Sequence, residues 1–213
     1  SRSYPASAVL WGEHPYVRWP LYVAVDVAPK HDNSAVAAVA YDPIHATVSL
    51  VEHKIWHPIE GEDFDLEATV EKFLLELKRK YTLRKVGYDP YQFHRSMVTL
   101  KQKGLPMEAF EQNPGNMTAA SQQLFDLLRT KALKAYPDPD CREHIKNAVA
   151  KDTGRGFRII KDPTQTKARK GATKKPVDFA VALAMAAYLA ISSGGVDTSR
   201  VQHIESPFGD ISP

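Results

Sequence analysis

The sequence predicts an α/β domain with a mixed five-stranded sheet flanked by helices. Three apolar, strand-forming segments follow one another with short connections, which is typical of an antiparallel meander. The apolar residues then recur with the period of a helix, and two further strands each follow a helix. Because such crossovers return the chain beside the sheet, we expect the fourth strand to lie parallel to the first.

The meander strands are predicted at residues 21–26, 35–41 and 47–56, where β-branched and other apolar side chains predominate. The connection between the first two strands contains Pro, Asp, Asn and Ser, and the second connection is Asp42-Pro-Ile-His45. These residue types favour turns, so they mark where each strand ends.

Changes of period and turn residues predict the later elements. Apolar residues from Leu66 to Tyr81 recur at i, i+4, i+7, i+8, i+11 and i+15, which is one face of a helix. Pro176 suits the first position of the last helix, where its missing N–H is not needed. The remaining predictions are strand 85–88, helix 94–103, strand 107–111, helices 118–130 and 138–150, a short strand or hairpin arm at 157–160, and a last helix at 176–191.

The composition supports one folded domain. Of the 213 residues, 43% are hydrophobic, which is enough for a sizeable core. We expect the domain to occupy residues 21–191, with a linker over 1–20 and a flexible tail over 192–213. The single cysteine, Cys141, allows no internal disulfide and excludes a cysteine-based zinc site.

The positive charge of the chain is concentrated in one segment. The formal net charge is +3, yet residues 151–175 contain nine Lys or Arg and two Asp. The remainder of the chain is therefore slightly acidic. A local basic segment on an acidic body favours a polyanionic partner, although a solvated loop has the same composition.

The predicted fold would bring three aspartate side chains close together. Asp26 ends the first strand, Asp89 ends the fourth, and Asp178 opens the last helix. Parallel neighbouring strands place their carboxyl ends at one edge, where open α/β sheets bind ligands. Carboxylates held together repel, and Mg²⁺ or Mn²⁺ would offset that repulsion. Each aspartate alone could equally serve in a turn or at a helix start, so the prediction depends on the three together.

Three motifs resemble those of a known family. They are Val23-Ala-Val-Asp-Val-Ala28 with the following Asn33-Ser-Ala-Val-Ala37, then Val86-Gly-Tyr-Asp-Pro90, then Lys175-Pro-Val-Asp-Phe-Ala-Val-Ala-Leu-Ala-Met-Ala186. In order and spacing the pattern resembles the RNase H-like (retroviral-integrase-like) nucleases, and among them the C-terminal nuclease domain of tailed-bacteriophage large terminase subunits. Leu133-Lys-Ala-Tyr136 and His144-Ile-Lys-Asn147 also resemble that family.

The resemblance implies a Mg²⁺- or Mn²⁺-dependent endonuclease that cleaves double-stranded DNA concatemers during viral genome packaging. Two-metal phosphodiester hydrolysis would make Asp26 the ligand bridging both ions, with Asp89 and Asp178 holding one ion each. The implied partners are DNA, a packaging ATPase domain of the same full-length protein, the portal and the small terminase, in the cytoplasm of the infected host. No apolar run is long enough to span a membrane.

The basic segment leads directly into Asp178, so it would lie beside the acidic edge. Basic side chains there could follow DNA phosphates without reading sequence. The candidates are Lys161, Lys167, Arg169, Lys170, Lys174 and Lys175. Similar terminases carry loops and a β-hairpin that limit access of DNA, which suggests a gating role for residues 157–175.

Other functions fit parts of the pattern. A Holliday-junction resolvase or a transposase-type nuclease would keep the fold and change the substrate. A sugar-kinase or actin-like ATPase domain also begins with a strand ending in Asp, but Val27-Ala28-Pro29 stands where that class needs Gly-Thr. A non-catalytic DNA-binding module would leave the three aspartates with structural roles only. His31, His94 and Asp32 lie near the motifs and are weaker candidates.

Overall fold

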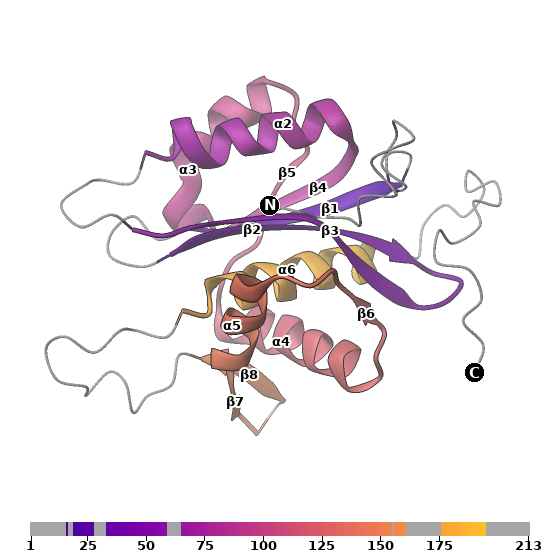
Figure 1. The fold of residues 1–213 in the computed structure, drawn as a ribbon. Coiled ribbons are helices and arrows are strands. Elements are labelled where there is room, and N and C mark those ends of the chain that lie inside the picture. The colour runs from indigo at the N-terminus through magenta and orange to yellow at the C-terminus, as the bar shows by residue number, and fades with distance from the viewer. Residues whose placement is uncertain are drawn as a thin grey trace, which may run out of the picture.

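A computed structural model describes residues 16, 19–27, 33–58, 65–154, 156–160 and 176–194. A six-stranded mixed sheet forms its centre, with helices on both faces (Figure 1). The α/β class and the mixed sheet are therefore confirmed. The strand order is β5-β4-β1-β2-β3-β6. The strands are β1 (Pro20–Asp26), β2 (Ser34–Asp42), β3 (Thr47–Trp56), β4 (Thr82–Tyr88), β5 (Met107–Ala109) and β6 (Leu133–Lys134).

The pairing follows the predicted topology and adds one strand. β1 pairs antiparallel with β2, β2 pairs antiparallel with β3, and β1 and β5 both pair parallel with β4. The sixth strand, β6, pairs parallel with β3 through Leu133 and Lys134. Five strands were predicted because two residues are too few to show the alternation by which a strand is read from sequence.

The helices cover the two faces unequally (Figure 1). A π-helical turn η1 (Glu67–Glu71) continues into α2 (Lys72–Lys80), and α2 lies with α3 (Pro90–Gln102) on one face. The other face carries α4 (Pro114–Arg129), α5 (Pro139–Asn147) and α6 (Asp178–Ser193). α3 and α4 begin four residues earlier than predicted, because Asp89 and Asn113 cap them and a proline follows each cap.

A two-stranded hairpin lies beyond α4. β7 (Val149–Asp152) pairs antiparallel with β8 (Phe157–Ile160), so the predicted continuation of a helix to residue 150 is wrong. α5 ends at Asn147, and the chain then turns into a strand. The Ile159 N–H donates to Ser121 Oγ over 3.0 Å, and the rings of Phe157 and Phe125 lie 5.3 Å apart. These contacts hold β8 on α4, and β8 in turn pairs with β7, where local sequence favoured helix.

Alternation along β1 divides the core into two halves. Leu21, Val23 and Val25 point to the side of α2 and α3, whereas Tyr22 and Ala24 point to the side of α6. α6 packs against both β1 and β2 on one side and against α4 on the other. Most of its side chains are buried, many of them alanines, which allow close approach on all sides. None of the described helices is both long and apolar enough to cross a membrane.

One such approach depends on a glycine in β4. A Cβ added to Gly87 would overlap Cδ1 of Leu189 on α6. We expect Gly87→Ala to lower the free energy of unfolding by about 1–3 kcal/mol, the usual cost of overpacking a core. Gly115→Ala is the matched control, since its Cβ would meet nothing nearer than 3.5 Å and alanine favours a helix. Equal urea midpoints for the two variants would contradict the packing of α6 on β4.

Candidate active site

Asp26 and Asp89 lie at the same edge of the sheet. Val25 of β1 and Tyr88 of β4 are partners in the parallel pairing, and each aspartate follows one of them directly. Adjacent strands are spaced about 4.8 Å apart, so the two residues are neighbours across the sheet. Topology thus brings together two carboxylates that stand far apart in sequence.

The amino end of α6 reaches this edge as well. β2 begins at Ser34 where β1 ends, because Asp26 and Ala35 are antiparallel partners. The amide of Asn33, just before β2, lies 3.3 Å from Nε2 of His144, whose Nδ1 accepts a hydrogen bond from the N–H of Phe179. Asp178 precedes Phe179 and is the first residue of α6. The first turn of α6, which carries Asp178, is therefore connected to the edge of Asp26 through His144 and Asn33.

Asp89 has a structural role in addition to any chemical one. Its Oδ1 accepts a hydrogen bond from the N–H of Tyr91 over 3.1 Å, which caps α3. The residue is 8% exposed. The cap fixes the carboxylate at the end of β4, so a helix start and an acidic site share one side chain.

Gln112 contacts Asp26 and was not predicted. Its Nε2 donates to Oδ1 of Asp26 over 2.9 Å and also lies 3.5 Å from Sδ of Met185 on α6. Gln112 follows β5, which pairs parallel with β4, so it stands at the same carboxyl edge. Attention to every polar residue after a parallel strand would have found it. Gln112 orients Asp26 from the side that α6 covers.

A buried carboxylate on the other face was also missed. Glu71 ends η1, is 6% exposed, and its Oε2 has no hydrogen-bond partner among the described residues. η1 packs against α3, the helix that Asp89 caps. The sequence suggested only that this segment is the core face of a helix. Glu71 is therefore a further acidic candidate on the side of α3.

The carboxylates are of the kind that binds a hard divalent cation, but the ligand atoms of Asp26, Asp89 and Asp178 do not all lie within 4.8 Å of one another. Asp178 is 5% exposed and Asp89 8%, and burying such charge is costly unless positive charge or hydrogen bonds offset it. Carboxylate oxygens are the ligands that Mg²⁺ and Mn²⁺ prefer. Asp26, Asp89 and Asp178 would hold such ions, with Gln112 orienting Asp26.

A second group could also hold a metal ion. Within the described ranges it is the one set of three ligand residues whose atoms all lie within 4.8 Å of one another: His53, Asp138 and Cys141. These residues already engage protein partners. Tyr136 Oη hydrogen-bonds Nδ1 of His53, and the N–H of Cys141 donates to Asp138 Oδ1 over 2.9 Å. Burial, together with the charge of Asp138, raises the pKa of the Cys141 thiol well above its ordinary value.

His53 should make stability depend on pH. Burial lowers its pKa from the ordinary 6.5, although Asp138 and Asp140 act in the opposite direction. The unfolded chain therefore takes up a proton at a higher pH than the folded chain does. We expect the stabilising contribution of neutral His53 to be fully present above about pH 6.5. The free energy of unfolding should decrease as the pH falls below that value. Urea denaturation at pH 7 and pH 5 measures this, and an equal decline in His53→Gln would contradict the assignment.

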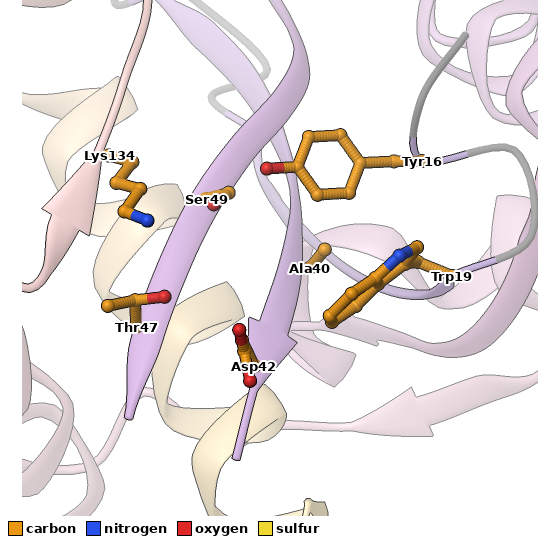
Figure 2. Close-up of a pocket in the computed structure, with 7 residues that line it drawn as sticks. All are labelled: Tyr16, Trp19, Ala40, Asp42, Thr47, Ser49 and Lys134. Carbon is orange, nitrogen blue, oxygen red and sulfur yellow. The ribbon is translucent and has the colours of Figure 1, made fainter. Parts of the chain in front are cut away.

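A small pocket lies at the opposite end of the sheet (Figure 2). It has room for about 10 Å³, near the minimum for one water molecule, and therefore cannot hold a substrate. Trp19 is one of the lining residues, and its Nε1 is buried without a hydrogen-bond partner among the described residues. The lining residues are Tyr16, Trp19, Ala40, Asp42, Thr47, Ser49 and Lys134.

Several predicted residues lie outside the described part of the chain. They include His31 and Asp32, the side chain of His94, and most of the predicted linker and tail. The same holds for all six proposed DNA-binding residues: Lys161, Lys167, Arg169, Lys170, Lys174 and Lys175. Of the proposed gate, β8 is described, and it packs on α4.

Comparison with known proteins gives structural matches alone. No family model matches the sequence, and no curated protein does. The large terminase of bacteriophage HK97 matches with a TM-score of 0.66 at 17% identity over 85% of this chain. The large terminase nuclease domain of Thermus phage P74-26 matches with a TM-score of 0.56 at 13% identity, covering 79% of this chain and 78% of that one.

This chain has the fold of a large terminase nuclease domain. The large terminase nuclease from phage G20c with bound cobalt also matches, with a TM-score of 0.55 at 13% identity over 82% of each chain. The match to HK97 large terminase spans only 42% of that protein. The resemblance found in the sequence motifs is thus confirmed for the terminase nuclease fold.

Proposed function

We propose that this chain is a Mg²⁺- or Mn²⁺-dependent endonuclease that cuts double-stranded DNA concatemers during packaging of a phage genome. The proposal is supported by the pairing of β1 with β4, which makes Asp26 and Asp89 neighbours, and by the contacts through His144 and Asn33 that connect the first turn of α6 to the same edge, in a fold similar to that of terminase nuclease domains. The packaging ATPase of the same full-length protein, the portal and the small terminase would be its partners, in the cytoplasm of the infected host.

The residues divide the work by position. Two divalent ions, when bound, would supply activation of the attacking water and stabilisation of the leaving oxygen. Asp26 would bridge the ions because it lies between β2 and β4 at the centre of the edge. Asp89, fixed by its cap, and Asp178, fixed on α6, would each hold one. Gln112 would keep Asp26 oriented through its 2.9 Å hydrogen bond.

DNA would approach on the side where the basic segment joins α6. We propose that Lys161, Lys167, Arg169, Lys170, Lys174 and Lys175 contact phosphates there. A hollow of about 650 Å³ supports this, because it lies between α4 and the hairpin and Arg158 lines it. Its lining begins at Pro114, two residues after Gln112. Residues 157–175 would gate the access of DNA to the acidic edge.

Plasmid cleavage tests the proposal. We expect nicking and linearisation with Mn²⁺ or Mg²⁺, and neither with EDTA. Cys141→Ser is the control that separates the two possible metal groups: it removes one ligand from the second group and should leave cleavage unchanged. Cleavage by the wild type in EDTA would contradict the proposed acidic site. Loss of metal-dependent cleavage in the Cys141→Ser variant would contradict it too.

A further inference from the structure

Helix α5 holds the chain on both sides of Asp178. Nδ1 of His144 accepts a hydrogen bond from the N–H of Phe179 over 3.0 Å. Nδ2 of Asn147, one turn later, donates to the carbonyl oxygen of Pro176 over 3.3 Å. The two bonded backbone groups flank Asp178, so the backbone that carries this carboxylate is fixed from a neighbouring helix.

The contact from His144 replaces a missing helix cap. An N-cap side chain normally accepts a hydrogen bond from the second or third residue of the helix. The cap residue of α6 is Val177, which has no side-chain acceptor and makes no capping bond. Phe179 is the second residue of α6, and His144 provides the acceptor that its N–H needs. The start of α6 is therefore set by a residue of α5.

The same imidazole ties α6 to the sheet. Because Nδ1 accepts from Phe179, the proton of the neutral ring stands on Nε2. The contact made by Asn33 is through Nδ2, which lies 3.3 Å from Nε2, so two donors would face each other. An acceptor is required there, so Asn33 should present its amide oxygen to the ring. Asn33 immediately precedes β2, so His144 joins α6 to the edge where Asp26 lies.

The side chain next to Asp178 is held in the same way. Phe179 is fully buried, and its ring packs edge-on against His53 with centroids 5.3 Å apart and against His144 at 6.5 Å. Tyr136 in turn holds His53 through Nδ1. Rotation of the first turn of α6 would break contacts with both α5 and β3.

We propose that His144 and Asn147 are positioning residues, which hold Asp178 where it binds the metal ion. The inference rests on the proposed nuclease function. Neither side chain need touch metal or DNA, so each acts through the backbone around Asp178. Loss of a partner that orients a metal ligand typically weakens metal affinity 10–100-fold. Replacing either residue should therefore weaken metal binding more than it lowers the stability of the fold.

The test compares side chains of one shape at position 144. Asparagine and leucine are nearly isosteric, but only asparagine offers an acceptor near the place of Nδ1. We expect His144→Asn to bind Mn²⁺ nearly as wild type does, and His144→Leu to bind roughly 10-fold more weakly. Asn147→Leu should weaken binding in the same direction, with Asp178→Asn as the reference for loss of the ligand itself. Titration followed by the electron paramagnetic resonance of free Mn²⁺ measures affinity, circular dichroism confirms folding, and plasmid cleavage against Mn²⁺ concentration is recorded in parallel.

The outcomes separate the inference from the function on which it rests. Wild-type affinity in both His144→Leu and Asn147→Leu would overturn the inference while leaving the nuclease proposal intact. So would an equal loss in His144→Asn and His144→Leu, because the acceptor would then be irrelevant. If His144→Leu does not fold, the change at the half-buried Asn147 decides alone. A wild-type chain that neither binds Mn²⁺ nor cleaves DNA would overturn both proposals.

Discussion

Asp26→Asn should abolish metal-dependent DNA cleavage while leaving the domain folded. The change keeps the shape of the side chain and the acceptor for Gln112, but removes the negative charge proposed to bridge two ions. We expect the cleavage rate to fall by more than roughly 100-fold. Removal of a residue that only orients a metal ligand costs up to about 100-fold, and loss of the ligand itself should cost more. The rate of supercoiled plasmid loss at saturating Mn²⁺ measures the effect.

Asp42→Asn is the matched control for that experiment. Asp42 is also an aspartate at the end of a strand of the same sheet, but β2 ends at the opposite edge. It accepts hydrogen bonds from the N–H groups of Ile44 and His45 in the turn to β3. Its replacement should leave the cleavage rate unchanged. Equal losses in the two variants would indicate a general effect of charge on the sheet rather than a metal site.

Phe179→Ala should be among the most destabilising single substitutions. The side chain is fully buried where α6, α5 and β3 meet, and the two histidine rings that pack on it could not fill the space left. Truncation of a buried phenylalanine typically costs about 3–5 kcal/mol in the free energy of unfolding. Urea denaturation at pH 7.5, where the histidines are neutral, would measure it.

Phe125→Ala gives the corresponding control in the same protein. Phe125 is 40% exposed on α4 and contacts Phe157 of the hairpin. Its loss removes less buried surface and leaves no enclosed cavity, so the decrease in stability should be clearly smaller. A Phe125→Ala variant as unstable as Phe179→Ala would mean that the hairpin, rather than α6, carries the stability of this face.

Most strands of the central sheet were predictable because their own residues show the alternation and flanking turns of a strand. The meander, the parallel return of β4 and the carboxylates that end β1 and β4 all follow from period and turn chemistry within short windows. β6 and β7 were missed or misassigned because pairing partners stabilise them: β3 pairs with β6, and β8 pairs with β7. The contacts between β3 and β6 connect residues far apart in sequence, whereas β7 depends on a nearby hairpin partner.

The neighbours of the acidic residues were hidden for the same reason. Gln112 contacts Asp26 across 86 positions, and Asn33 meets His144 across 111. The motif that contains His144 and Asn147 could be recognised in the sequence, but not what it binds. The start of the last helix shows the difference most directly. Pro176 suggested the first position of α6, whereas the helix begins at Asp178 with its capping acceptor supplied by α5.

The fit of Leu189 against Gly87 also fixes how far α6 can slide along the sheet. Leu189 lies eleven residues from Asp178, which is roughly 16 Å along a helix at 1.5 Å per residue. A helix packed on all sides moves as a rigid body, so an axial shift at one end appears undiminished at the other. The position of the Asp178 carboxylate is therefore set partly by a glycine remote from it, so residues around Gly87 would tune the geometry of the proposed metal site from a distance.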